Sequence, residues 1–232
     1  MTADGTDRPP PAPPPSSPHR TMPKVFGIGL SRTGTTSLTS ALHTLGFDVV
    51  HYPSDPDTYA TLLAGTARFP LLDRYDGITD ITVAHCYQDL DVLWPGAKFV
   101  LTVREEESWL CSCRKHWERP VESKGHRGQV YVDLQRFLRA AVYGCHAFSP
   151  ERFRRIARRH TAEATRHFAG RDDDLLVLDI TAGQGYERLA PFLGVPVPDA
   201  PFPHRNRAAA DGSPRQEGPP CPSLPSSPAP GK

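Results

Sequence analysis

Residues 24–47, "KVFGIGLSRTGTTSLTSALHTLGF", constrain the fold of this 232-residue chain more than any other segment. An apolar run enters a Gly/Ser/Thr loop, and the loop leads into an amphipathic helical pattern. Gly29 and Gly34 are separated by four residues. Glycines let backbone N–H groups close around an anion, and a helix N-terminus adds partial positive charge. The segment is therefore typical of a phosphate-binding loop in an α/β protein.

This loop lacks the lysine of NTP-binding loops, because Thr35 follows Gly34 where that lysine would stand. The cation is instead Arg32, whose planar fork suits bidentate contact with phosphate or sulfate oxygens. An ordinary glycine-rich turn is the alternative interpretation. The candidate anion-binding residues of the loop are Ser31, Arg32, Thr33, Gly34, Thr35, Thr36 and Ser37.

Short apolar runs alternate with helical patterns along the rest of the core. The runs that predict strands are 24–30, 47–52, 97–103 and 175–180, and the helical patterns are 35–45, 56–65, 82–94, 105–118, 129–147, 150–169 and 185–193. Such alternation predicts a three-layer α/β fold with a central, mainly parallel sheet of four or five strands. A P-loop-like topology follows from the position of the loop after the first strand.

The prolines divide the chain. Seven of 26 lie in residues 1–22 and seven more in 209–232, and both stretches hold almost nothing apolar to bury. We therefore expect disordered tails at 1–22 and 209–232 around one domain at 23–208.

The net charge of +1 does not favour nucleic-acid binding. No apolar stretch is long enough for a membrane helix, and no hydrophobic leader is visible, so we expect a cytoplasmic protein. The oligomeric state is not readable.

A second candidate anion site follows the run 97–103. Arg104 comes at the end of that strand, where open parallel sheets bind ligands, and Ser108 and Ser112 lie one and two helical turns further on. An arginine and a serine in this arrangement can hold a phosphate. The alternative is that Arg104 neutralises one of three glutamates, 105–107, which also suit the first turn of a helix.

Three segments together resemble the sulfotransferase family, specifically its compact bacterial members. "LSRTGTTSL" is similar to the family's 5′-phosphosulfate loop, and "VREEESWLCS" to its 3′-phosphate motif. Residues 175–206, "LLVLDITAGQGYERLAPFLGVPVPDAPFPHRN", resemble its closing strand, helix and proline-rich loop. The resemblance spans residues 24–206 and keeps the order of the motifs.

The resemblance implies a P-loop-like sulfotransferase fold and the co-substrate 3′-phosphoadenosine 5′-phosphosulfate, with no metal and a small-molecule acceptor that offers a hydroxyl or amine. It places the phosphosulfate on Arg32, Thr33, Gly34, Thr35 and Thr36, and the 3′-phosphate on Arg104 and Ser112. By the same resemblance, Arg205 and Arg207, in "PFPHRNR", are candidates for the basic loop that closes over the 3′-phosphate in cytosolic relatives. Many members have lysine where Arg32 stands. Since arginine stays charged, we assign Arg32 electrostatic stabilisation rather than acid catalysis.

The proton of the acceptor needs a base. Asp80, in "TDIT", matches the position of the family's base, although aspartate is also a preferred helix N-cap. His85 is the second candidate, for which burial or exposure without a catalytic role is the more frequent outcome. His51, at the end of the run 47–52, carries less weight still. The basic segment 115–127 is a candidate acceptor lid or a solvated loop.

Three other functions compete with sulfuryl transfer. A P-loop kinase or NTPase that uses Mg-ATP would take Asp179 as its magnesium ligand, but it leaves Thr35 and the Arg104–Ser112 pair unexplained. A methyltransferase would use Gly183 and Gly185 after Asp179, but only about two dozen foldable residues follow, too few for such a domain. A binding module without catalysis remains if Asp80 only caps a helix.

Overall fold

A computed structural model describes residues 22–118 and 128–204 and contains one five-stranded sheet in the order β2-β3-β1-β4-β5. Each neighbouring pair of strands is parallel. The strands are β1 (Val25–Gly27), β2 (Val49–His51), β3 (Gly77–Thr79), β4 (Lys98–Thr102) and β5 (Leu175–Leu178). The first strand of the chain therefore lies at the centre of the sheet, and the loop that follows it emerges between the ends of β3 and β4.

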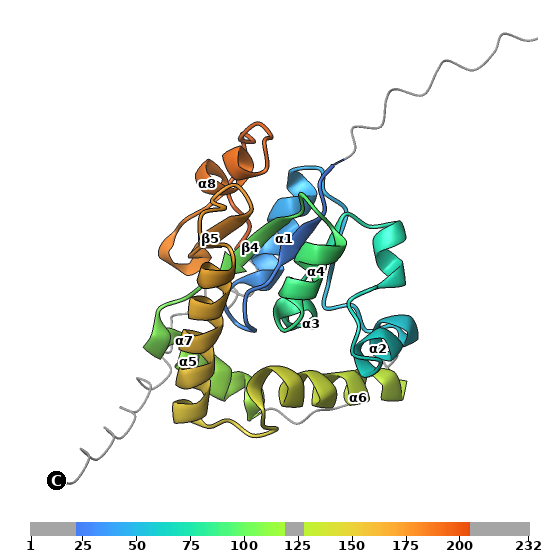
Figure 1. Ribbon diagram of the computed structural model, residues 1–232. Helices are drawn as coiled ribbons and strands as arrows, with labels where there is room; N and C mark the ends of the chain where they lie inside the picture. The colour runs from blue at the N-terminus through green and yellow to red at the C-terminus, as the bar shows by residue number, and fades with distance from the viewer. Residues whose placement is uncertain (1–21, 119–127, 205–232) are drawn as a thin grey trace, which may run out of the picture.

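Helices cover both faces of the sheet (Figure 1). They are α1 (Thr35–Thr44), α2 (Pro56–Leu63), α3 (Ile81–Ala84), α4 (Tyr87–Leu93), α5 (Glu106–Trp117), α6 (Gly128–Leu138), α7 (Pro150–His167) and α8 (Tyr186–Phe192). Two short 3₁₀ helices, η1 (Pro70–Asp73) and η4 (Ile180–Ala182), and one π-helical turn, η3 (Arg139–Tyr143), complete the described elements.

Side chains that alternate along each strand build two separate cores. Val100 of β4 packs with residues of α1 and α8, whereas its neighbours Phe99 and Leu101 pack with residues of α4, α5 and α7. This period of two is what a strand buried on both faces requires. The predicted three-layer α/β fold with a parallel sheet is confirmed.

Two element predictions were wrong in detail. Strand β3 was not expected, because Gly77–Thr79 holds one apolar residue and gives no apolar run. The helix expected at 82–94 is two helices, α3 and α4, separated at His85 and Cys86. The pattern at 129–147 continues past α6 only as the π-turn η3, which ends at Gly144 with φ of 64°.

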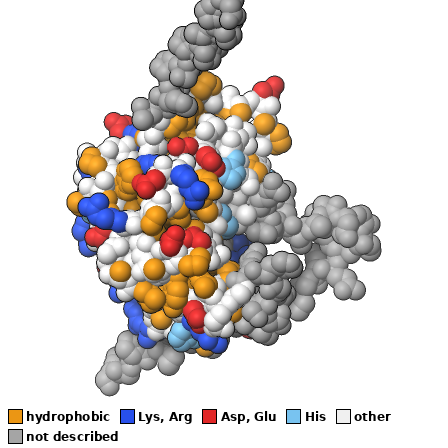
Figure 2. Space-filling view, turned by 90° about the vertical axis from the view of Figure 1, so that its right-hand side faces the viewer, with side chains coloured by type: hydrophobic (Ala, Val, Ile, Leu, Met, Phe, Trp, Pro, Cys, Tyr) orange, Lys and Arg blue, Asp and Glu red, His pale blue; other side chains and the backbone are white. Residues whose placement is uncertain are grey.

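The predicted proline-rich tails lie outside the described residues except for Met22, and so does most of the basic segment 115–127. Within the described ranges, none of the helices is long and apolar enough to cross a membrane. Basic and acidic side chains are interspersed over the face shown in Figure 2.

Gly29, two residues after β1, is required by the close approach of β4. A Cβ atom at this position would overlap the hydroxyl of Thr102 and lie 2.8 Å from its carbonyl oxygen. We predict that Gly29→Ala lowers the free energy of unfolding by about 1–3 kcal/mol in urea titrations, since overpacking forces the backbone to shift. The penalty should shrink in a Thr102→Ala background, where the hydroxyl is gone. Wild-type stability of Gly29→Ala would contradict this packing.

Candidate active site

A cavity of about 830 Å³ lies at the carboxyl ends of the strands and is lined by residues that follow each of the five. This is the edge at which open parallel sheets bind ligands. The structure brings eight of the residues singled out from the sequence into the cavity wall, namely Ser31, Arg32, Gly34, Thr35, Thr36, Ser37, Asp80 and Arg104. The two segments expected to bind anions therefore share one cavity.

The loop after β1 is held at Ser31 by two aromatic side chains. The Ser31 N–H donates to the Tyr143 hydroxyl at 3.0 Å, and the Trp109 indole N–H donates to the Ser31 carbonyl at 2.9 Å. Tyr143 is fully buried and Trp109 nearly so. Since buried hydrogen bonds of this kind fix a single geometry, α5 and η3 set the conformation of the loop.

Thr33 does not line the cavity. Its hydroxyl donates to the Leu30 carbonyl at 2.6 Å and lies 2.6 Å from the hydroxyl of Thr102 on β4. Thr33 thus ties the loop to the sheet, while the residues on either side of it face the cavity.

The N-terminus of α1 opens on the cavity without a side-chain cap. Gly34 is the N-cap residue, with φ of 104°, and Thr35 and Thr36 follow it in the cavity wall. The first N–H groups of a helix have no partner within the helix. Together with the helix dipole, they make this end of α1 suitable for an anion.

Arg32 and Arg104 lie side by side, each oriented by a serine of α5. Arg32 Nε donates to Ser112 Oγ at 3.0 Å. Arg104 donates to Ser108 Oγ from Nε at 3.0 Å and from Nη2 at 2.7 Å, and Arg104 Nη1 donates to the Arg32 carbonyl at 3.3 Å. Ser112 therefore lies behind Arg32, outside the cavity wall.

The glutamates that follow Arg104 have other partners. Glu105 caps α5 by accepting from the N–H groups of Glu107 and Ser108. Glu106 pairs with Arg154 and Arg158 at 2.8 and 2.7 Å, and Glu107 pairs with Arg154 at 2.7 Å. In the part of the chain that the structure describes, Arg104 and Arg32 form no ion pair, which disfavours the alternative in which Arg104 only neutralises a glutamate.

The charge of this pair is partly buried and has no ion-pair partner among the described residues. Burial, and after it the positive charge of Arg32, lowers the pKa of the Arg104 guanidinium. Because arginine stays protonated nonetheless, the two like charges repel each other. An anion between them would relieve that repulsion.

Asp80, after β3, both caps a helix and faces the cavity. Its Oδ1 accepts from the Ile81 N–H at 2.7 Å, and its Oδ2 lies 3.4 Å from Nε2 of His51 on β2. The residue is 8% exposed. The two roles that the sequence offered for Asp80, cap and cavity-facing carboxylate, are therefore compatible.

The hydrogen bonds around His51 determine which ring nitrogen carries a proton. The Thr39 hydroxyl donates to the Thr35 carbonyl at 2.9 Å, so it accepts from the Thr79 hydroxyl at 2.7 Å. With its own proton used, Thr79 accepts from His51 Nδ1 at 3.1 Å. Nδ1 is thus protonated, and Nε2 faces Thr36 at 3.2 Å and the Asp80 carboxylate. Nε2 is the nitrogen free to take up or release a proton.

Backbone strain is concentrated at this cavity. Arg32, Tyr52 and Asp80, with φ of 71°, 47° and 83°, are the non-glycine residues of positive φ within residues 22–118 and 128–204, and all three line the cavity. Such conformations cost about 1–3 kcal/mol each and persist where the surroundings hold them, often at functional sites.

Other candidates lie away from the cavity or beyond the described residues. His85 is exposed at the end of α3 and does not line the cavity. Arg205 and Arg207 lie outside the described residues.

The Asp179 carboxylate, the magnesium ligand of the kinase alternative, accepts from the Thr181 hydroxyl at 2.7 Å and the Ala182 N–H at 2.9 Å. Sequence reasoning missed Tyr143 and Trp109, for which no local motif exists.

One comparison with known proteins identifies the family of the chain. The family model of a sulfotransferase domain matches residues 24–210. Ava biosynthesis cluster protein M of Aspergillus versicolor is 26% identical in an alignment of 212 residues, and the match covers 78% of this chain and 80% of that protein. A crystal structure of a sulfotransferase from Alicyclobacillus acidocaldarius aligns with 77% of this chain and 83% of its own, with a TM-score of 0.46 and 16% identity.

The contact between Tyr143 and Ser31 can be tested without assuming a reaction. We predict that Tyr143→Phe lowers the free energy of unfolding by about 1–3 kcal/mol, because it leaves the buried Ser31 N–H without an acceptor. Tyr186→Phe is the matched control, since the buried Tyr186 hydroxyl has no hydrogen-bond partner within the described residues. Equal stability of the two variants in urea titrations would show that the Ser31 contact does not stabilise the loop.

Proposed function

Because the chain belongs to the sulfotransferase family, we propose that it transfers a sulfuryl group from 3′-phosphoadenosine 5′-phosphosulfate to a hydroxyl or amine of a small-molecule acceptor. The observation that carries the proposal is the pair Arg32 and Arg104, which face one cavity with no carboxylate partner among the described residues while the nearby glutamates bind other arginines. Two such cations suit a ligand with two separated anionic groups.

In this proposal the loop and α1 hold the phosphosulfate end of the donor. Arg32 contacts its oxygens from one side, and the N–H groups and hydroxyls of Thr35 and Thr36 contact them at the helix N-terminus. Ser31, Gly34 and Ser37 complete the wall, and Thr33 and Ser112 position the loop and Arg32. Arg104 holds the 3′-phosphate, and Arg205 would join it from the chain beyond the described residues.

The transfer needs a base and charge stabilisation. The donor supplies a sulfuryl group on a phosphate leaving group, and the acceptor oxygen or nitrogen forms its bond to sulfur as the sulfur–oxygen bond to phosphate breaks. Asp80 takes the proton of the acceptor, and His51 Nε2, 3.4 Å away, can receive that proton from the carboxyl group. Arg32 stabilises the electron pair left on the phosphate oxygen, since it cannot donate its own proton. His85 takes no part, because it lies outside the cavity wall.

Several sequence-based expectations accompany this function. None of the motifs requires a metal, and no nucleic-acid or membrane partner is proposed. The cytoplasm is the proposed location, and the residues outside 23–208 are proposed to lie outside the catalytic domain.

Removal of Arg104 should weaken nucleotide binding. We predict that Arg104→Ala lowers the affinity for the product adenosine 3′,5′-bisphosphate by about 2–4 kcal/mol in calorimetric titrations, because a phosphate loses its charged partner. Arg155→Ala, an exposed arginine on α7, is the control. Equal affinity of the two variants would remove Arg104 from the nucleotide site.

Substitution of Asp80 separates the base from the cap. Asparagine can still cap α3 through its side-chain oxygen, but it cannot accept the acceptor's proton. We predict that Asp80→Asn reduces kcat by at least about tenfold and leaves the bisphosphate affinity nearly unchanged. Turnover equal to that of the wild type would show that Asp80 acts only as a cap.

A further inference from the structure

The cavity divides into two sides along the strand order. Arg104 follows β4 and Thr181 follows β5 on one side of the loop after β1, whereas His51 and Tyr52 belong to the β2 edge on the other side, beyond Asp80. If the proposed function is correct, the donor occupies the β4 side and the acceptor the β2 side. The residues of the β2 side then determine which acceptor binds.

Arg139, the first residue of the π-turn η3, is a buried cation in the wall of this cavity. It is 6% exposed, and within the described residues its guanidinium donates one hydrogen bond, from Nη1 to the His146 carbonyl at 3.3 Å. Among residues 22–118 and 128–204, no carboxylate forms an ion pair with it. Arginine has five N–H donors, so most of its hydrogen-bonding capacity is unused by these residues.

A buried charge without a counter-ion is costly, often by several kcal/mol. Burial lowers the pKa of the Arg139 guanidinium, and the groups that act on it electrostatically are Tyr52, Tyr131, Cys145 and Tyr143, none of which is a carboxylate. Arg171, by contrast, is more exposed and pairs with Asp91 at 2.7 Å. An anion that enters the cavity would compensate the charge of Arg139.

This cation is distinct from the Arg32–Arg104 pair. The charges that act on Arg104 are those of Arg32, Asp179 and Glu105, and they do not include Arg139. The groups that act on Arg139 are Tyr52, Tyr131, Cys145 and Tyr143, of which Tyr52 belongs to the β2 side. One cavity therefore carries two separate cationic points, and the second is not required by the donor.

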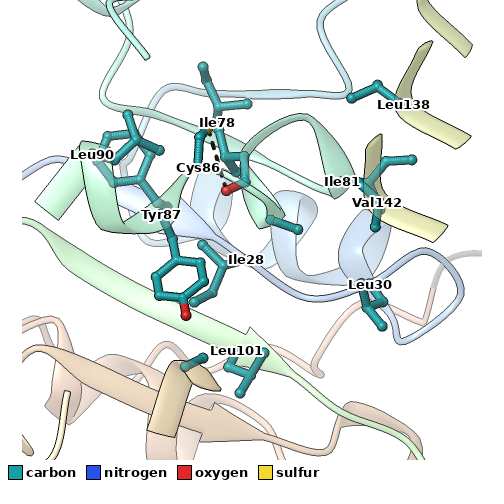
Figure 3. Close-up of a cluster of buried hydrophobic side chains, with 14 of the residues drawn as sticks. Ile28, Leu30, Ile78, Ile81, Cys86, Tyr87, Leu90, Leu101, Leu138 and Val142 are labelled. Carbon is teal, nitrogen blue, oxygen red and sulfur yellow. Dashed lines mark hydrogen bonds between the residues drawn. The ribbon is translucent and has the colours of Figure 1, made fainter. Parts of the chain in front are cut away.

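Packing fixes the position of Arg139 relative to Asp80. The flanking residues Leu138 and Val142 are buried in the same core cluster as Ile81, which directly follows Asp80. Figure 3 shows Ile81 on the side of its helix that faces Leu138 and Val142. In Figure 1, α6 runs along the base of the molecule from α2 toward α7, and the π-turn that follows it contacts α7. A group held so rigidly can select a ligand by geometry.

Aromatic side chains surround the guanidinium. It lies over the Trp117 ring at 5.0 Å, which occupies one of its faces and leaves its edge for a planar partner. The rings of Tyr52 and Tyr131 are 6.1 Å apart, edge to face, and both line the cavity. The Trp117 indole N–H is buried without a hydrogen-bond partner among the described residues. These walls suit a flat, partly apolar body that carries an anion at one end.

We propose that Arg139 binds a carboxylate of the acceptor, and that the substrate is a hydroxy acid with an aromatic or otherwise planar body. The proposal rests on the proposed function. The carboxylate lies against the edge of the guanidinium, the planar body lies beside Tyr52 and Tyr131, and the hydroxyl at the other end reaches Asp80. Planar bidentate recognition of a carboxylate is what an arginine provides and a lysine does not.

The test compares hydroxyaryl alkanoic acids of increasing chain length with their own methyl esters, which keep the body and remove the charge. With the full chain and the donor, at least one acid should have a kcat/KM at least about tenfold above that of its ester, as a charge-assisted pair implies. Arg139→Met should abolish this preference, and Arg139→Lys should retain part of it.

Binding measurements keep the two proposals separate. The affinity of Arg139→Met for adenosine 3′,5′-bisphosphate should stay within about twofold of the wild type, because the proposal places Arg139 on the acceptor and not on the nucleotide. On a scale where about 1.4 kcal/mol corresponds to tenfold, this is a small change. Failure of the wild type to bind the bisphosphate would overturn the proposed function. Two outcomes would overturn the role of Arg139 alone, provided that the wild type binds the bisphosphate. Either the esters have the same kcat/KM as their acids, or no acid binds to the enzyme–bisphosphate complex. The wild-type comparison decides this even if Arg139→Met does not fold.

Discussion

The conformation of the phosphate-binding loop depends on how Ser31 is held. Its N–H group binds a tyrosine 112 residues away and its carbonyl binds a tryptophan 78 residues away. Tyr143 belongs to the π-turn that also carries Arg139, and Trp109 belongs to the helix whose serines orient Arg32 and Arg104. Both hydrogen bonds are buried, so neither exchanges readily with water. One backbone position thus couples the loop to both cationic points of the cavity.

The distribution of charge explains why the cavity suits anions although the chain is nearly neutral overall. Acidic residues close to the cavity are engaged elsewhere: Glu106 and Glu107 with arginines of α7, and Glu105 at the start of its own helix. Asp80 is the cavity carboxylate, and its neighbour is a histidine rather than an arginine. Arg32 and Arg104 therefore remain available for a ligand, which is the arrangement that electrostatic stabilisation of a transferring group requires.

The sequence predicted the features that are local. The strand–loop–helix segment, the position of Arg104 at a strand end and the parallel sheet follow from patterns within about twenty residues, the range over which periodicity is informative. His51 became a strong candidate for the site only when the pairing of β2 with β3 placed it opposite Thr79, next to Asp80. That pairing was not predictable, because β3 holds one apolar residue and gives no strand pattern. Tyr143 and Arg139 lie in a helical pattern, and nothing in that pattern shows that Tyr143 reaches a loop more than a hundred residues earlier or that Arg139 lines the cavity.

The central claim is that this cavity holds a nucleotide through two arginines and a helix N-terminus, without a lysine in the loop and without a metal. The most direct test is a calorimetric titration of the full chain with adenosine 3′,5′-bisphosphate in buffer free of divalent cations, compared with a titration of Mg-ATP. We expect the bisphosphate to bind at least about tenfold more tightly than Mg-ATP, a difference of about 1.4 kcal/mol or more. Tight binding of Mg-ATP with weak binding of the bisphosphate would contradict the account.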